Sequence, residues 1–428
     1  MIILSHESAN QHEPVVSIKV VGLGGAGGNI LNYIIDSGFS GAEFVAVNTD
    51  IQALSLSKAQ YKVQVGIKST KGQGSGANPE TGKRAIEEDL EKVLEAIGAA
   101  DIVFLIGGGG GGTGSGALPV IAKALKERNI LCVVVVTKPF TFEGKRRDLV
   151  AQSMIDMLKT AVDTLIVIPN QKLLDVVDQR VSMIDAFGMI NNVVCQSVKG
   201  ISEIITKPGH INVDYADVRA IMKDRGLAVM GTGRASGANR AEEAALQAIS
   251  SPLFENVSIE GAQAVLLNIT GGSNLSLHEI SRAASLVHEL AHEDANIILG
   301  SVIDENMKDE VMITLIATGF EKTVQKAVQV QAQEQPIQIV NGIGVAKKDE
   351  HVSIERVAKN EQSNPQAAQS VHQPLPTAYD RAIASEYSGY QKGTINSESM
   401  QQYQDSSSSS LDIPTFLRNK QKHDPNGW

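Results

Sequence analysis

Hydrophobic residues fall into short runs between about residue 15 and residue 167, and helix-like segments separate these runs. Valine and isoleucine dominate the runs, as is typical of strands that are buried on both faces of a sheet. The predicted strands are Val15–Val21, Glu43–Asn48, Ile102–Ile106, Leu131–Thr137 and Leu165–Ile168, and the predicted helices include Thr81–Ile97, Ala117–Glu127 and Asp148–Ala161. Strands that alternate with helices at this spacing predict a parallel sheet covered on both faces.

A long amphipathic stretch, Met183 to Ile205, is predicted to form one helix. A second, smaller group of elements follows it. The predicted strands of this group are Ala262–Thr270, Ile297–Ile303 and Glu310–Thr318, and its predicted helices are Ala241–Ile249 and Leu277–Ala291. We therefore expect an α/β protein with a parallel-sheet domain, a long central helix, a smaller α/β C-terminal domain and a disordered tail.

The composition changes after about residue 320, where Gln, Ser, Ala and Lys dominate and a serine run occupies residues 406–410. Apart from a short apolar patch at Ile337–Val345, this segment has too little apolar surface to offset its chain entropy, so we expect a disordered linker. An apolar island, Leu411 to Arg418, comes after it. Such islands in otherwise polar tails are typical of short docking peptides.

Composition narrows the class of protein. The chain has 428 residues, 42% of them hydrophobic, and a formal charge of −10, which argues against a general nucleic-acid-binding protein. The two cysteines, Cys132 and Cys195, do not have metal-ligand spacing and are expected to be buried apolar side chains. Met1–Pro14 lacks the features of a signal peptide, and the longest apolar run, Ile130–Val136, is too short to cross a bilayer. We expect a cytoplasmic protein without direct membrane insertion.

A glycine-rich loop, Gly22 to Asn29, directly follows the first predicted strand and opens a helix. Glycine lets the backbone approach a phosphate closely, and a helix N-terminus offers free N–H donors. Gly22, Gly24 and Gly27 also fit the dinucleotide pattern G-x-G-x-x-G, with Glu43 about 20 residues further on. This loop alone therefore leaves open a nicotinamide or flavin site, or a tight turn without a ligand.

A second glycine-rich loop, Gly107 to Gly116, follows the strand at Ile102–Ile106 and contains eight glycines in ten residues. Such a costly stretch is favoured where many backbone amides converge on an anion. Because both loops leave the carboxyl ends of parallel strands, they should lie on one rim, which suits a triphosphate better than a pyrophosphate bridge. The pattern G-x-x-x-x-G-K-[ST] does not occur in the sequence, which disfavours a P-loop NTPase.

Gly107–Gly116 resembles the signature loop of tubulin, and Ile18 to Phe320 resembles the tubulin/FtsZ family of GTPases. Other segments that carry the resemblance are Asn48–Leu54, Thr70–Pro79, Thr137–Phe140, Phe142–Arg147, Asn212–Asp217, Arg240–Ala244 and, near the C-terminus, Asp412–Arg418. The resemblance implies a chain organised as a flexible N-terminus (1–14), a GTP-binding domain (15–182), a central helix (183–206), a C-terminal GTPase-activating domain (207–320), a disordered linker (321–410) and an adaptor-binding peptide with a tail (411–428).

The resemblance also implies a GTP or GDP site with Mg²⁺. Its expected residues are Gly24, Gly25, Ala26, Gly27, Gly28, Asn29, Asp50, Gly76, Ala77, Gly111, Gly112, Thr113, Gly114, Ser115, Glu143, Arg147, Asn170, Phe187 and Asn191. Backbone amides of the two loops would surround the phosphates, and the 72–78 loop would sense the γ-phosphate. Glu143 would accept from the ribose hydroxyls, with Arg147 near the phosphates. Phe187, otherwise an ordinary core aromatic, would stack on the base that Asn191 reads.

Three positions depart from the usual FtsZ pattern. Asn191 replaces an aspartate whose carboxylate can accept from two guanine N–H groups, although tubulin also has asparagine there. Gly109 stands where methionine is usual, which we expect to loosen the loop, and Ser115 stands where threonine is usual. None of these three departures removes a group that is expected to take part in catalysis.

Asn212, Asp214 and Asp217 are the expected catalytic residues. From spacing alone, Asp214 and Asp217 look like a helix N-cap and a first-turn acid. The resemblance instead implies that these acids lie far from their own nucleotide and complete the site of the next subunit in a head-to-tail filament. Hydrolysis would then be activated by polymerisation.

Two alternatives remain at this point: a nicotinamide- or flavin-dependent oxidoreductase, and a nucleotide-binding scaffold without hydrolysis. The sequence shows no clear arrangement of His or Lys for hydride transfer, which counts against the oxidoreductase. Asp214 and Asp217 are present, which counts against a scaffold without hydrolysis. The expected partners are further copies of the chain and, through Asp412–Arg418, membrane-tethering division adaptors. The resemblance thus implies a protein of the mid-cell division site, under the membrane.

Overall fold

The computed structural model describes residues 16–178, 180–207, 209–254 and 259–320. The predictions for the N-terminus, the linker and the Asp412–Arg418 peptide lie outside these residues. Within them, no helix is long and apolar enough to cross a membrane.

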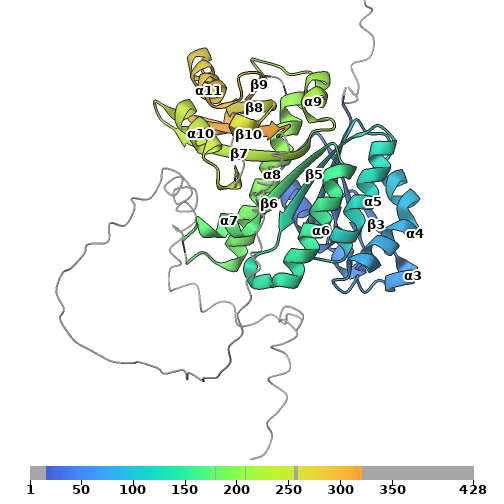
Figure 1. Cartoon of the computed structure of the whole chain (residues 1–428). Helices are drawn as coiled ribbons and strands as arrows, with labels where there is room; N and C mark the ends of the chain where they lie inside the picture. Colours follow the sequence, from blue (N-terminus) through green and yellow to red (C-terminus); the bar gives the residue numbers. More distant parts are fainter. Residues whose placement is uncertain (1–15, 179, 208, 255–258, 321–428) are drawn as a thin grey trace, which may run out of the picture. The chain divides into compact units, whose positions relative to one another are not determined.

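The ten strands of the described residues form a single sheet, in the order β3-β2-β1-β4-β5-β6-β7-β10-β8-β9 (Figure 1). Their bounds are β1 Ile18–Leu23, β2 Glu43–Asn48, β3 Tyr61–Gln64, β4 Ile102–Gly108, β5 Leu131–Lys138, β6 Thr164–Pro169, β7 Gly226–Ser236, β8 Ala264–Gly271, β9 Asn296–Ile303 and β10 Glu310–Thr318. Pairing is parallel from β3 to β7, antiparallel on both sides of β10, and parallel between β8 and β9. The predicted α/β class is confirmed, and each predicted strand lies within three residues of an observed one.

Helices cover both faces of this sheet. The main helices are α1 Gly24–Asp36, α4 Pro79–Ile97, α5 Thr113–Glu127, α6 Lys145–Ala161, α8 Met183–Thr206, α9 Tyr215–Met222, α10 Arg240–Ile249 and α11 Leu277–Leu290; the shorter ones are α2 Ile51–Ser55, α3 Ile67–Thr70 and α7 Asn170–Asp175. In the N-terminal part, α1, α8 and α9 pack on one face, and α4, α5 and α6 pack on the other. In the C-terminal part, α10 and α11 cover the face opposite to α8 and α9.

The alternation of side chains along β4 explains this two-sided core. Phe104 and Ile106 join the cluster under α1 and α8, while Val103 and Leu105 join the cluster under α4 and α5. All four side chains are buried. A strand between two helix layers must be apolar at every position, and this is the run that the sequence shows.

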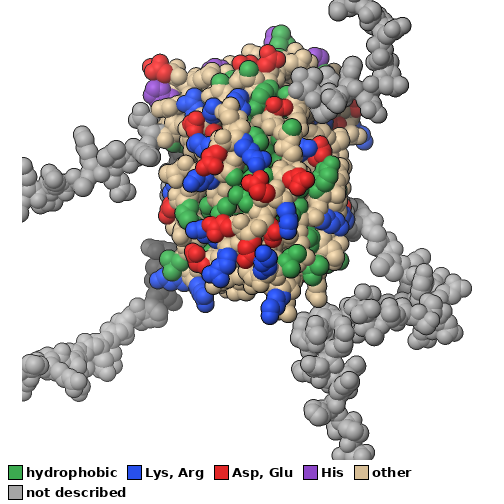
Figure 2. Space-filling view, turned by 90° about the vertical axis from the view of Figure 1, so that its right-hand side faces the viewer, with side chains coloured by type: hydrophobic (Ala, Val, Ile, Leu, Met, Phe, Trp, Pro, Cys, Tyr) green, Lys and Arg blue, Asp and Glu red, His purple; other side chains and the backbone are tan. Residues whose placement is uncertain are grey.

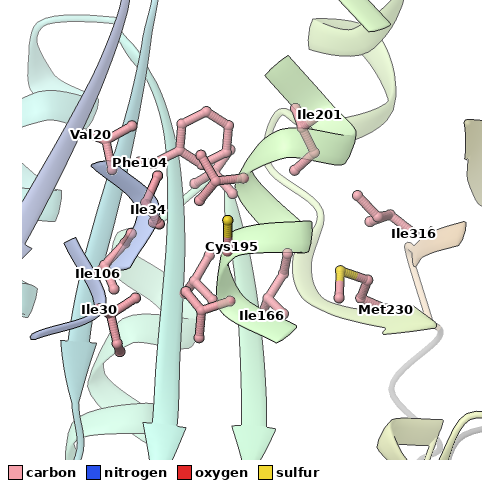
Figure 3. Close-up of a cluster of buried hydrophobic side chains, with 14 of the residues drawn as sticks. Val20, Ile30, Ile34, Phe104, Ile106, Ile166, Cys195, Ile201, Met230 and Ile316 are labelled. Atoms are coloured by element: carbon pink, nitrogen blue, oxygen red, sulfur yellow. The ribbon is translucent and has the colours of Figure 1, made fainter. Parts of the chain in front are cut away.

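Helix α8 connects the two parts of the sheet. The side chain of Ser182 caps its N-terminus by accepting from the amide of Asp185, and the helix ends one residue after the predicted bound. Figure 3 shows Cys195 and Ile201 of α8 between the strand and α1 residues of the N-terminal core and Ile316 of β10. Both cysteines are buried free thiols, as predicted, and burial raises their pKa values.

The second group of strands continues the first sheet, because β7 pairs with β6 from Thr164 to Ile166. The buried carboxylate of Asp163 holds this joint. It accepts from the amide of Cys132 at 2.9 Å and from the amide of Asp224 at 3.3 Å, while its carbonyl accepts from the amides of residues 225 and 226. The sequence pattern did not show β7, because small residues occupy much of it.

Glycine explains the close packing on β7. A Cβ at Gly231 would lie 1.9 Å from the carbonyl oxygen of Ala248, and a Cβ at Gly233 would lie 2.0 Å from that of Ala244. Helix α10 therefore rests directly on the backbone of the strand. The hydrophobic pattern is weak here because the backbone itself provides the contact.

Charged side chains of both signs are interspersed on the side where α4 and α5 lie in Figure 1 (Figure 2). Arg128, directly after α5, forms an ion pair with Glu91 of α4 at 3.4 Å. Exposed pairs of this kind contribute little to stability, so the apolar layers beneath hold the helices in place.

Candidate functional site

A cavity of about 610 Å³ lies at the carboxyl ends of the parallel strands, where β1, β2, β4 and β5 end. Its lining residues are Leu23, Gly25, Ala26, Asn29, Ile30, Asn48, Thr49, Asp50, Ala53, Gln73, Gly74, Ser75, Gly76, Ala77, Gly108, Gly109, Gly111, Gly112, Thr113, Gly114, Thr137, Pro139, Glu143, Arg147, Asn170, Phe187, Ile190 and Asn191. The rim therefore unites both glycine-rich loops, as the sequence predicted.

The N-termini of α1 and α5 meet at one end of the cavity. Gly24 opens α1 with a φ of +70°, and a Cβ there would lie only 3.0 Å from the amide nitrogen of Gly114 in α5. Gly25 has open space beside its Cα and lines the cavity. Two helix N-termini in contact place free N–H groups and two positive dipole ends around one point, which suits a chain of phosphates.

The second glycine-rich loop is held by hydrogen bonds on both sides. The amide of Gly109 donates to the carbonyl of Thr137 at 2.8 Å, and the amide of Gly110 donates to Ser115 Oγ at 3.1 Å. A Cβ at Gly109 would lie 2.7 Å from the Cβ of Ala151, so α6 packs where a longer side chain would project. The structure thus gives Gly109 a packing role and Ser115 a role in shaping the loop.

Asp50 and the 72–78 loop form a second wall. One carboxylate oxygen of Asp50 caps α2 by accepting from the amides of Gln52 at 2.8 Å and Ala53 at 3.2 Å. The amide of Ile51 donates to the carbonyl of Gly72 at 3.2 Å, which fixes the loop against residue 50. Gly76 and Ala77 both have positive φ values, 60° and 56°, where the loop turns over the cavity.

Glu143 and Arg147 lie at the far wall and form an ion pair with 2.5 Å between Oε2 and Nη1. The other carboxylate oxygen of Glu143 accepts from the amide of Phe140 at 3.0 Å. This hydrogen bond fixes the carboxylate at the cavity edge, where it can accept from hydroxyl groups of a ligand. Arg147 is half exposed and can turn towards an anion.

An aromatic side chain and two amides form the remaining end. Phe187 is 40% exposed and packs edge-on against Phe140, with ring centroids 5.3 Å apart. Asn191 follows one turn later on α8 and lines the same cavity. Asn170 is only 5% exposed, and its Oδ1 has no hydrogen-bond partner among the described residues. A buried acceptor facing a cavity is costly unless a ligand donates to it, so this end suits a planar base with N–H groups.

Four predicted ligand residues do not line the cavity: Gly24, Gly27, Gly28 and Ser115. Gly27 is required by packing, because a Cβ there would lie 2.4 Å from the carbonyl oxygen of Ile106. Thr49, Thr137, Pro139 and Ile190 line the cavity without having been predicted as ligands, whereas Ser75 belongs to the 72–78 loop that was expected beside the γ-phosphate. Isolated hydroxyl and apolar residues have no sequence signal of their own, although Thr49, Ser75, Thr137 and Pro139 lie inside the segments that carry the family resemblance.

The three expected catalytic residues lie away from this cavity. Asn212, Asp214 and Asp217 are exposed at the start of α9. Asn212 Oδ1 accepts from the amide of Gly209 at 2.9 Å. Asp214 occupies the N-cap position of α9 but makes no side-chain capping bond. Neither carboxylate has an ion-pair partner among the described residues.

Helix α9 lies at the amino ends of the parallel strands. Tyr215 Oη donates to the carbonyl of Asp101 at 3.0 Å, immediately before β4 begins, and Arg219 donates to the carbonyl of Asn129, two residues before β5. The cavity lies at the other end of β4, beside Gly108. A strand of this length spans about 20 Å, so these acids cannot reach the cavity of their own chain.

The chain matches known proteins in both parts of its sheet. A model described as the Tubulin/FtsZ family, GTPase domain, matches residues 17–178, and one described as the FtsZ family, C-terminal domain, matches residues 226–321. An FtsZ dimer structure from M. jannaschii is 42% identical, over 72% of this chain and 90% of that chain, with a TM-score of 0.69.

Two more distant structures share the fold. The GDP-bound monomer of CetZ1 from Haloferax volcanii is 24% identical, over 71% of this chain and 94% of that chain, with a TM-score of 0.62. The GTPγS-bound protofilament of CetZ2 from the same organism is 22% identical, over 72% and 94%, with a TM-score of 0.61. From the family models, the FtsZ structure and a cavity built for phosphates and a base, the chain belongs to the FtsZ family and is a tubulin-like GTPase that binds GTP and GDP.

Proposed function

We propose that this GTPase forms head-to-tail filaments of the cell-division ring, and that each GTP is hydrolysed with acidic residues of the adjacent subunit. The observation that carries the proposal is the separation of the two halves of the machinery. The cavity offers amides and hydroxyls, whereas Asp214 and Asp217 are exposed, without ion-pair partners among the described residues, at the opposite end of the strands. Stacking one subunit on another brings these two ends together, and such a contact repeats without closing.

The roles of the cavity residues follow from their positions. Amides at the N-termini of α1 and α5 bind the phosphates, and the 72–78 loop lies beside the terminal phosphate. Glu143 accepts from the ribose hydroxyls. Phe187 packs against the base, while Asn170 and Asn191 meet its polar edge.

Mg²⁺ fits this site as an ion held mainly by the nucleotide. The described residues contain no group of three or more His, Cys, Asp or Glu that could bind a metal by themselves. Asp50 lines the cavity beside the 72–78 loop, and one of its carboxylate oxygens is already engaged in capping α2. Mg²⁺ commonly keeps its waters and binds phosphate oxygens with one or two carboxylates, so it would neutralise charge on the phosphates here.

In the proposed reaction, the chain's own residues position and stabilise. The backbone amides of Gly25, Ala26 and Gly112–Gly114 stabilise the negative charge that spreads over the transferred phosphoryl oxygens. Asp214 and Asp217 of the adjacent subunit orient the attacking water and accept its proton. Product GDP lacks the terminal phosphate beside the 72–78 loop, which weakens the contact between subunits.

A mixing experiment tests the shared site. Gly25→Leu places a side chain into the cavity without a clash, because a Cβ at Gly25 meets no atom within 4 Å. Asp217→Ala removes the opposite half. Each variant alone should release little phosphate. A 1:1 mixture should recover roughly a quarter of wild-type activity, since both halves of an interface are then intact in about one contact in four. Failure of the mixture to recover, with both variants folded and able to co-assemble, would refute the proposal.

We also propose that the Asp412–Arg418 segment binds a membrane-tethering division adaptor and thereby places the filament under the membrane at mid-cell. The support is the sequence alone: an apolar, proline-containing island after a polar stretch. Removing residues 411–428 should abolish mid-cell localisation while leaving assembly and GTP hydrolysis unchanged in solution.

A further inference from the structure

Three hydroxyl groups meet behind the phosphate end of the cavity. Thr49 Oγ1 lies 2.7 Å from Thr113 Oγ1, and Ser75 Oγ lies 3.0 Å from the same atom. Thr49 directly follows β2, Ser75 lies in the loop before α4, and Thr113 lies in the first turn of α5. They are 0%, 9% and 8% exposed, respectively, and all three line the cavity.

The three hydroxyls have one proton more than the two hydrogen bonds between them require. Three hydroxyls carry three protons, and the two hydrogen bonds use two of them. The third proton has no acceptor among the described residues, so it is available to a ligand in the cavity. If both outer hydroxyls donate to Thr113, the free proton belongs to Thr113, which sits at the N-terminus of α5 where an anion binds. A hydroxyl that accepts two hydrogen bonds is also a stronger donor.

The packing around Ser75 supports a fixed arrangement. A Cβ at Gly112 would lie 2.2 Å from Ser75 Oγ, so the 72–78 loop rests directly on the backbone of the phosphate loop. The carbonyl of Thr49 accepts from the amide of Gly74 at 3.4 Å, and residues 50 and 73 form a β-bridge. The three elements therefore hold their hydroxyls in one place.

We propose that Thr49 and Ser75 are positioning residues, which donate to Thr113 and direct its proton to an oxygen of the terminal phosphate of GTP. The 72–78 loop thus contacts the terminal phosphate through Thr113. This inference rests on the proposed placement of that phosphate beside the loop. It concerns nucleotide affinity in a single subunit and does not depend on the acids of a neighbour.

Paired substitutions at Thr49 separate the hydroxyl from its packing. Thr49→Val keeps the shape and removes the hydroxyl, whereas Thr49→Ser keeps the hydroxyl and removes a methyl group. The affinities for a non-hydrolysable GTP analogue and for GDP are measured at protein concentrations below the concentration at which filaments assemble. We expect Thr49→Val and Ser75→Ala to weaken the analogue about fivefold more than GDP, and Thr49→Ser to bind both nucleotides like the wild type.

Thr318→Val is the matched control, because Thr318 also has a buried hydroxyl bond, 2.9 Å to the carbonyl of Ile221, but lies away from the cavity. It should leave both affinities unchanged. Ser75→Ala carries the test if Thr49→Val does not fold. Unchanged affinities in folded Thr49→Val and Ser75→Ala, or equal losses for the analogue and GDP, would overturn the proposal. These outcomes would not refute the shared-site proposal, because that proposal is tested separately by phosphate release in mixed filaments.

Discussion

The cavity at the carboxyl ends of the parallel strands consists largely of backbone amides and buried hydroxyls, whereas the segment around Asp214 at their amino ends presents exposed carboxylates. Residues of the first region are fixed by close contacts, such as Gly24 against Gly114 and Ser75 against Gly112. The side chains of Asp214 and Asp217 have no hydrogen bond or ion pair to fix them among the described residues. The first region can bind a nucleotide by itself, while the second needs a surface to act on. If the proposed shared site is right, nucleotide binding and hydrolysis are separable by mutation.

The strongest test of this comparison is the removal of an acid. Asp217→Ala should lower the rate of GTP hydrolysis in filaments by at least about 100-fold, because the group that orients or deprotonates the water is lost. GTP affinity of the unassembled subunit should not change. Phosphate release and equilibrium nucleotide binding check the two parts. A variant that hydrolyses normally would place the catalytic group elsewhere.

A substitution in the cavity should instead weaken nucleotide binding. Asn170→Ala should reduce GTP affinity by about tenfold, because the ligand loses the acceptor that Oδ1 provides. The nucleotide-free protein should not lose stability, since Oδ1 has no partner among the described residues. Asn170→Asp, which keeps an acceptor, is the control. Equal GTP affinity in Asn170→Ala and the wild type would remove Asn170 from the base site.

A third test compares Glu279, an acid in an ion pair, with the acids proposed to be catalytic. Glu279 accepts from Arg240 at 2.7 Å and from the amide of Ser276 at 2.9 Å. The guanidinium of Arg240 lowers the pKa of Glu279 to about 2. Since this pKa is depressed on folding, the stabilisation is complete above the unfolded value of about 4.3 and is lost as the pH falls towards 2.

Glu279→Gln should therefore cost about 1–2 kcal/mol at neutral pH and flatten the loss of stability between pH 5 and pH 2. Urea unfolding as a function of pH measures this effect. Asp214→Asn is the matched control, and it should leave the free energy of unfolding unchanged because Asp214 is exposed without an ion-pair partner among the described residues. A pH profile of Glu279→Gln identical to that of the wild type would show that the ion pair does not stabilise the fold.

The smallest expected effect concerns the aromatic side chain at the base end. Phe187→Ala should weaken GTP and GDP equally, by about fivefold, because the half-exposed ring offers part of a stacking surface. Phe187→Tyr should bind both like the wild type. Fluorescence titration with each nucleotide measures the change. A loss confined to GTP would indicate a role at the phosphates instead.

Strong periodic signals made much of the fold predictable. The runs at Glu43–Asn48 and Glu310–Thr318 match β2 and β10 at both ends, because β-branched runs bounded by turn residues have few alternatives. The pattern did not show β3 or β7. β3 is a four-residue edge strand that is largely exposed, and β7 carries glycines where α10 contacts its backbone. Neither has the apolar alternation from which strands are predicted.

The candidate site was predictable to a similar extent. The two glycine loops have a sequence signal because only glycine permits such backbone paths and contacts. The contact of Thr49 and Ser75 with Thr113 has no sequence signal, because 26 positions separate Thr49 from Ser75 in the chain and they meet only through Thr113. Gly27 and Ser115 carry the same loop signal as the lining residues, although they support the loops from behind the cavity.

The parallel α/β core, the two glycine-rich loops and the family were predictable from the amino-acid sequence, because they depend on local pattern and on residue types with few conformational substitutes. The sequence did not show that the strands of both parts join in one sheet at β6 and β7. The structure also puts Asp214 and Asp217 at the end opposite to the cavity, where only the family resemblance had implied them. Only the tertiary structure decided which hydroxyls meet at Thr113. These relations join residues far apart in the chain, and packing rather than local preference sets the distances between them.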